Sequence, residues 1–185
     1  MPGPDARVTA RRLLHRGRKF DFEMVEHPGP GGKVLRREVV RHPGSVVIVP
    51  ILEGPEGARV VLIRNWRPAL EKEVLELPAG TLEQGEEPTA CARRELCEET
   101  GYEAEAVTLL GRFYTSPGLS DEFMTAFVAT GLRHVGQRLE EDEQLTVEPM
   151  TVPAALAAVE RGELVDAKSM LALLLAERRG MLRAG

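Results

Sequence analysis

The feature that most constrains the fold is a short helix that follows two strands. The β-branched runs SVVIVPIL at 45–52 and RVVLIR at 59–64 predict these strands, with the turn EGPEG between them. Residues 89–99 then change to a helical pattern, with Pro88 placed to begin the helix and Gly101 placed to end it. A helix that follows buried strands is expected to pack on their sheet.

Further strands and helices are predicted on both sides of this region. Before it, the extended segments Lys19–Glu26 and Val34–His42 are joined by the turn-rich PGPGG at 28–32. After it, strands are predicted at Val107–Tyr114, Glu122–Ala129 and Leu145–Met150. A helical region follows at Pro153–Arg178 and is broken near Gly162. The pattern predicts an α/β fold, an α/β/α sandwich with a mixed sheet and a small N-terminal antiparallel sheet. We expect a β-rich segment at 1–44 and a catalytic domain at 45–185.

The composition is that of a soluble globular protein, with 43% hydrophobic and 29% charged residues in a chain of 185. No apolar run approaches the roughly 20 residues of a membrane helix, and the N-terminus lacks the apolar stretch of a secretory leader. We therefore expect a cytoplasmic protein without membrane contact. A net charge of −5 argues against a nucleic-acid partner. Cys91 and Cys97 are expected on opposite faces of the helix as reduced thiols.

Three glutamates of the predicted helix point to metal chemistry. Glu95, Glu98 and Glu99 stand at i, i+3 and i+4, so their carboxylates share one side of the helix. Such close like charges are unfavourable unless cations lie among them, and hard oxygen ligands suit Mg²⁺, with Mn²⁺ as the alternative. Arg94 is placed to orient Glu86 or Glu98. The segment therefore predicts a divalent metal site.

The glycine before this helix is expected to assist the same site. Gly80 permits an unusual backbone turn, which would bring the carbonyl of Ala79 toward the metals. Glu95, Glu99 and the Ala79 carbonyl are the expected ligands, and Glu98 is a further ligand, direct or through water.

The whole segment GTLEQGEEPTACARRELCEETGY at 80–102 follows the spacing G-x5-E-x7-R-E-U-x-E-E-x-G-U, in which U is bulky and apolar. This pattern resembles the Nudix box, in which all nine fixed positions are present. Outlying segments resemble the ADP-ribose pyrophosphatase branch of the Nudix superfamily over nearly the whole chain. They are REVVRH at 37–42, RNWRP at 64–68, ELPAG at 76–80, SPGLSDE at 116–122, EEDE at 140–143 and GELVDAKS at 162–169.

The resemblance implies substrate contacts outside the box. Pro117 lies sixteen residues after Gly101, as is typical of this branch, and the loop it begins carries Glu122 toward the terminal ribose. Arg67 and Arg37 correspond to substrate-binding arginines, although Asn65 stands where the branch commonly has Gln. A loop-capping role for Arg67 and a solvent-facing role for Arg37 are the alternatives.

A general base is required as well, because a polarised water must lose its proton during attack. Relatives place a glutamate on a loop after the box, which assigns Glu141 as the base and Glu143 as an extra metal ligand, with an ordinary acidic loop as the alternative. Phe20, Phe22 and Trp66 are candidates to stack on adenine, and we expect core packing for at least two of the three.

The resemblance implies metal-dependent hydrolysis of the diphosphate of ADP-ribose, which is a nucleoside diphosphate sugar, to AMP and ribose 5-phosphate. It also implies a homodimer in which N-terminal strands help to form the nucleotide pocket. Two other functions remain open: hydrolysis of another nucleoside diphosphate sugar of the ADP-glucose or GDP-mannose type, and binding of ADP-ribose as a sensor without cleavage.

Overall fold

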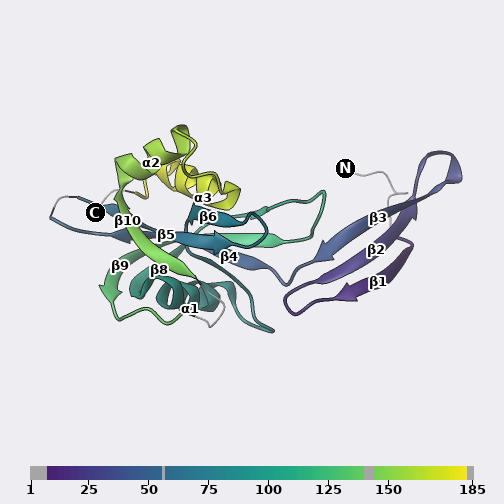
Figure 1. Cartoon of the computed structure of the whole chain (residues 1–185), viewed down its shortest axis with the longest axis horizontal. Helices are drawn as coiled ribbons and strands as arrows, with labels where there is room; N and C mark the ends of the chain where they lie inside the picture. The colour runs from purple at the N-terminus through teal and green to yellow at the C-terminus, as the bar shows by residue number, and fades with distance from the viewer. Residues whose placement is uncertain (1–7, 56, 140–143, 183–185) are drawn as a thin grey trace. The chain divides into compact units, whose positions relative to one another are not determined.

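The computed structural model of the chain describes residues 8–55, 57–139 and 144–182. The chain divides into two compact units, one formed by Met1–Gly44 and Tyr114–Phe123, the other by Ser45–Phe113 and Met124–Gly185. Figure 1 shows the strands and helices of both.

The first unit is a three-stranded antiparallel sheet in the order β1-β2-β3, formed by β1 (Ala10–Arg16), β2 (Asp21–Pro28) and β3 (Val34–Arg41). The predicted hairpin is confirmed as β2 and β3, which are joined through the 3₁₀ turn η1 (Pro30–Gly32). Strand β1 was not predicted. Every residue of its sequence ARRLLHR is exposed, so it carries no alternation of apolar and polar residues that would mark a half-buried strand.

The second unit contains a mixed seven-stranded sheet. Its strands are β4 (Ser45–Leu52), β5 (Arg59–Arg67), β6 (Lys72–Glu76), β7 (Ala79–Thr81), β8 (Tyr102–Tyr114), β9 (Phe123–His134) and β10 (Leu145–Thr151). The main order is β10-β5-β4-β9-β8, while β6 pairs with β5 and β7 pairs with β4. Strand β4 runs parallel to β9 and antiparallel to β5 and β7, so the sheet is mixed, as predicted.

Helices cover both faces of this sheet. They are α1 (Pro88–Thr100), α2 (Val152–Glu160) and α3 (Ala167–Arg178). The side chains of β4 alternate between two hydrophobic clusters: Val46 and Ile48 pack with Leu96 of α1, and Val47 and Val49 pack with residues of α2 and α3. The predicted α/β/α sandwich is therefore confirmed. Within the described residues, no helix is long and apolar enough to cross a membrane.

Several sequence-based expectations differ from the structure. Strands β6 and β7 were not predicted, because they are short and interrupted by Pro78, and β8 and β9 extend well beyond the expected ranges. The expectation of core packing for the aromatic residues is wrong, since Phe20, Phe22 and Trp66 are 51%, 37% and 43% exposed. The described part of the first unit buries only one hydrophobic side chain, Val25, so it has no core to receive Phe20 and Phe22. Both cysteines are free thiols, as predicted.

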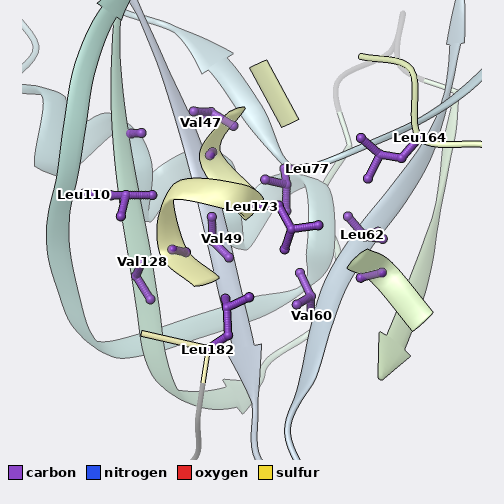
Figure 2. Packing of buried hydrophobic residues seen from close by; sticks show 14 of the residues in the cluster. Val47, Val49, Val60, Leu62, Leu77, Leu110, Val128, Leu164, Leu173 and Leu182 are labelled. Atoms are coloured by element: carbon purple, nitrogen blue, oxygen red, sulfur yellow. The ribbon is translucent and has the colours of Figure 1, made fainter. Parts of the chain in front are cut away.

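The larger cluster contains Leu173 of α3, which is fully buried and lies close to Val49 and Val60 (Figure 2). Leu173→Ala is expected to lower the free energy of unfolding by about 2–5 kcal/mol, because it removes buried methyl groups and leaves a cavity. The neighbouring Leu174 is 47% exposed, and Leu174→Ala is expected to change stability by less than about 0.5 kcal/mol. Urea unfolding followed by circular dichroism measures both, and equal effects would contradict this assignment of the core.

Candidate active site

Helix α1 begins and ends where the sequence predicts. Pro88 occupies its first turn, where a missing N–H costs no hydrogen bond. Gly101 ends it in the left-handed conformation, with φ of 74°, and its N–H donates to the carbonyl oxygen of Cys97 at 2.9 Å. The glutamates therefore stand on a helix whose two ends are both fixed.

Arg94 links three of the acidic side chains. Its Nε and Nη2 each lie 2.9 Å from one carboxylate oxygen of Glu86, which makes the pair bidentate. Its Nη1 donates to Glu95 Oε1 at 2.7 Å and to Glu98 Oε2 at 2.9 Å. The sequence predicted a contact with Glu86 or Glu98, and the structure has both and adds Glu95. The hydrogen bonds that Arg94 donates to Glu86 outweigh the effect of burial and lower the pKa of Glu86 to about 2.

Glu99 contacts β7. Its side chain is buried, and its Oε2 accepts a hydrogen bond from the backbone N–H of Ala79 at 2.8 Å. This contact holds the Ala79 peptide beside α1. The register of β7 against β4 fixes the same peptide from the opposite edge, because Ala79 pairs with Val47.

The reason for a glycine at position 80 differs from the expected one. Gly80 does not have a positive φ, and it lies in β7 paired with Val46, so the expectation of an unusual turn is wrong. A Cβ atom at this position would lie 1.8 Å from the carboxyl carbon of Glu95 and 1.9 Å from its Oε1. Glycine is therefore required because β7 passes directly against the buried Glu95 carboxylate.

The donor chemistry of this group suits a hard divalent cation. Carboxylates of α1 and the Ala79 carbonyl are oxygen ligands of the kind that Mg²⁺ accepts. In the described residues, no three acidic, histidine or cysteine side chains already converge in the arrangement of a metal site. Arg94 explains this, since Glu95 and Glu98 both turn toward its Nη1 atom. The residues fit a divalent metal by their chemistry, and Arg94 lies beside the carboxylates that would hold it.

Arg67 makes a contact that the sequence did not predict. Its Nε donates to Glu76 Oε1 at 2.7 Å and its Nη2 to Glu76 Oε2 at 2.5 Å, while 40% of its side chain stays exposed. The hydrogen bonds that Arg67 donates to Glu76 outweigh the effect of burial and raise the pKa of Arg67. Lys168 Nζ also donates to Glu76 Oε2, at 2.7 Å. The segments ELPAG and GELVDAKS contain both partners, but spacing alone does not show that residues ninety-two positions apart meet.

The two other predicted substrate residues lie in the first unit. Glu122 accepts a hydrogen bond at its Oε2 from Thr115 Oγ1 at 2.6 Å, and its Oε1 lies 4.0 Å from His42 Nε2. These contacts hold Glu122 at the end of the loop that contains Pro117. Arg37 is exposed on β3 and donates from its Nη1 to the carbonyl oxygen of Arg36 at 2.9 Å.

The predicted loop residues Glu141 and Glu143 lie outside the described residues. The segment before them is attached to the end of α1, since Gln137 Nε2 donates to the carbonyl oxygen of Glu99 at 2.6 Å and Arg138 N to that of Glu98 at 3.0 Å. On the other side, the carbonyl oxygen of Gln144 accepts from Trp66 N at 3.1 Å.

Comparison with known proteins identifies the family. The NUDIX domain model matches residues 41–173. The chain is 37% identical over 186 residues to an ADP-ribose pyrophosphatase of Bacillus subtilis (strain 168), covering 100% of this chain and 99% of the relative. It is 35% identical over 173 residues to an ADP-ribose pyrophosphatase of Mycobacterium tuberculosis (strain ATCC 25618 / H37Rv), covering 92% and 82%.

A solved structure described as an ADP compounds hydrolase superposes with a TM-score of 0.78 at 25% identity, covering 96% of this chain and 97% of the other. A GDP-mannose pyrophosphatase of Yersinia enterocolitica serotype O:8 / biotype 1B is similar at 29% identity over 176 residues, covering 89% of each chain. The family match and the full-length relatives agree with the glutamates of α1 and with the α/β/α sandwich around this helix. The chain belongs to the Nudix family.

Proposed function

We propose that this chain is a Nudix hydrolase that cleaves the diphosphate of ADP-ribose to AMP and ribose 5-phosphate. The observation that carries the proposal is the packing of Glu95 and Glu99 of α1 against β7 at Ala79 and Gly80, around the guanidinium of Arg94. Relatives named ADP-ribose pyrophosphatase that align over most of the chain support the choice of substrate.

Glu95, Glu99 and the carbonyl of Ala79 are proposed to hold Mg²⁺, with Mn²⁺ as a substitute and Glu98 as a further ligand. When bound, the metal neutralises the diphosphate and polarises the attacking water. Arg94 and Glu86 would then keep the carboxylates in place. Because the pKa of Glu86 is about 2, this residue stays ionised at any physiological pH and keeps its bidentate contact with Arg94.

The other roles are assigned to residues outside the helix. Glu141 is proposed to accept the proton of the attacking water, and Glu143 to add a metal ligand. The hydrogen bonds of Gln137 and Arg138 to carbonyls of α1 support this, since they attach the chain to the backbone of Glu98 and Glu99 shortly before that loop. Arg67 is proposed to bind the diphosphate.

Arg37 and Glu122 are proposed to contact the nucleotide and the terminal ribose. Glu122 is a suitable ribose ligand, because a carboxylate accepts hydrogen bonds from sugar hydroxyls and Thr115 already fixes its orientation.

The rival substrate is another nucleoside diphosphate sugar, because a relative named GDP-mannose pyrophosphatase is similar to this chain over most of its length. The diphosphate is common to both substrates, so the box cannot distinguish them. The non-catalytic rival, a sensor that binds ADP-ribose, is disfavoured by the complete set of box residues.

Product analysis tests the proposal directly. ADP-ribose incubated with the protein and Mg²⁺ is expected to yield AMP and ribose 5-phosphate, and a chelator is expected to stop the reaction. Glu99→Gln keeps the size of the side chain and is expected to lower kcat by about a hundredfold or more, because a metal ligand loses its charge. The matched control is Glu87→Gln, an exposed residue directly before α1, which is expected to be unaffected.

ADP-glucose and GDP-mannose are assayed in parallel, and kcat/KM is compared across the panel. A higher value for either hexose substrate would replace ADP-ribose as the substrate. Binding of ADP-ribose without any product would favour the sensor, and wild-type turnover by Glu99→Gln would remove its assignment as a ligand.

Gly80→Ala tests the close approach of β7 to Glu95. The added Cβ meets the end of a flexible side chain rather than backbone, so we expect the fold to survive while the Glu95 carboxylate moves. The Mg²⁺ concentration for half-maximal activity is expected to rise about tenfold or more. In the control Gly54→Ala, the nearest atom to the new Cβ is the Gly57 carbonyl oxygen at 3.7 Å, an ordinary contact. Unchanged Mg²⁺ dependence in Gly80→Ala would contradict the role of Glu95.

We also propose a homodimer formed through the first unit. Its three strands bury only Val25 among the described hydrophobic residues and leave Leu13, Leu14, Phe22 and Val34 exposed. Small sheets with so little interior need a partner to pack on. Light scattering at micromolar concentration is expected to give twice the 20.3 kDa of one chain, whereas the mass of a single chain would contradict the dimer.

A further inference from the structure

An ionic cluster connects the beginning of α3 with the ends of β5 and β6. We name Arg67, Glu76, Asp166, Lys168 and Ser169 the α3 cluster. Lys168 Nζ lies 2.7 Å from Glu76 Oε2 and 2.8 Å from Asp166 Oδ2. Arg67 forms its bidentate pair with the same Glu76 carboxylate. One buried carboxylate thus pairs with two cations, Arg67 nine positions before it in the sequence and Lys168 ninety-two positions after it.

The charged groups of the α3 cluster are largely buried, so each depends on its partners. The side chain of Glu76 is 3% exposed and that of Lys168 is 15% exposed. A buried carboxylate is costly unless it is paired and hydrogen-bonded, and removal of one partner leaves the other charge uncompensated. Glu76 Oε2 is shared by Arg67 Nη2 and Lys168 Nζ, so Lys168 fixes the oxygen on which the guanidinium of Arg67 is oriented. The orientation of Arg67 therefore depends on a residue of α3.

The α3 cluster also contacts residues 77–79, which lie beside α1. Asp166 caps α3 by accepting from the N–H of Ser169 at 3.1 Å and from its hydroxyl at 2.5 Å. Ser169 Oγ in turn accepts from the N–H of Leu77 at 2.7 Å. Two residues later, the N–H of Ala79 donates to Glu99. Residues 77–79 are therefore fixed from α3 at one end and from α1 at the other.

Arg67 retains donors for a ligand. Arg67 donates its Nε–H and one N–H of Nη2 to Glu76. Among the described residues, this leaves three of its five guanidinium N–H donors for an anion such as a diphosphate. The 40% exposure of its side chain makes them accessible. An arginine held this way on one side is preorganised, so less conformational entropy is lost when substrate binds.

We infer that Asp166, Lys168 and Ser169 are positioning residues of the active site, which act through Glu76 on Arg67 and through Leu77 on the Ala79 peptide. The inference rests on the proposed function for the contact between Arg67 and substrate. It assigns to the start of α3 a part in substrate binding, although none of the three residues needs to touch the substrate.

The decisive measurement is a double-mutant cycle between Lys168 and Arg67. Lys168→Met is expected to raise KM about tenfold and to change kcat by less than about threefold, because a partner that orients a ligand-binding group is lost. Lys168→Arg keeps the charge and is expected to restore KM to within about threefold of the wild type. The cycle uses ADP-ribose, or the panel substrate with the highest kcat/KM.

The second arm of the cycle uses Arg67→Lys, which keeps a cation on Glu76 but removes the bidentate contact. Adding Lys168→Met to this variant is expected to raise KM by less than about twofold, because Lys168 acts through the guanidinium. Full additivity of the two changes would overturn the inference. Arg178→Met, which removes an exposed cation from the last turn of α3, is the matched control and is expected to leave KM unchanged.

Asp166→Asn is a second variant that keeps the helix cap, since Asn caps helices as well as Asp does, but removes the charge that balances Lys168. If Lys168→Met does not fold, Asp166→Asn takes its place in the cycle, with an expected rise of KM of about threefold. An unchanged KM in Asp166→Asn would overturn the role of the Asp166–Lys168 pair.

A ligand-free measurement separates this inference from the proposed function. In protein labelled with ¹⁵N-arginine, the Nε–H of Arg67 is expected to exchange slowly in the wild type and faster in Lys168→Met. Unchanged exchange would overturn the inference even if ADP-ribose is hydrolysed. Faster exchange without hydrolysis of any panel substrate would support the positioning of Arg67 and overturn the proposed function.

Discussion

Burial of β4 on both faces is the constraint on which the second unit depends. Its side chains alternate between the cluster under α1 and the cluster under α3, so a single strand sets the positions of helices from distant parts of the sequence. The backbone of β4 also pairs with β7, which places Ala79 and Gly80 opposite Val47 and Val46. The peptide at Ala79 and the helix that carries the glutamates are thus both fixed by the same strand.

Charge is the second constraint on the site. Glu86, Glu95 and Glu98 all accept hydrogen bonds from Arg94, so three carboxylates share one guanidinium. Glu99 adds a further carboxylate, which accepts a hydrogen bond from the backbone N–H of Ala79. Negative charge therefore exceeds positive charge in a partly buried region, and a divalent cation is the simplest group that balances it. Arg94 balances part of this charge and holds Glu95 and Glu98 on one side of α1.

The sequence predicted what is local and missed what depends on distant contacts. The helix at 88–100 and its acidic side follow from residues a few positions apart, so spacing alone was sufficient. A glycine at position 80 was expected to matter, but its reason, the approach of Glu95, depends on how β7 packs on α1. The pair of Glu76 and Lys168 joins residues ninety-two positions apart, for which no local pattern exists. At least two of Phe20, Phe22 and Trp66 were expected to pack in a core, but all three are exposed.

Substrates that share a diphosphate are distinguished by residues outside α1. In the proposed function the glutamates of α1 act at the diphosphate, which every nucleoside diphosphate sugar contains. Relatives named for different substrates are similar to this chain over most of its length. Discrimination must therefore come from groups that bind elsewhere on the substrate or that set its position on the metals. Arg67 is proposed to bind the diphosphate and so to set the position of the substrate on the metals, and its geometry is fixed by Glu76 and Lys168 rather than by α1. Changes at the start of α3 can thus alter substrate binding while the chemistry at the carboxylate helix stays the same.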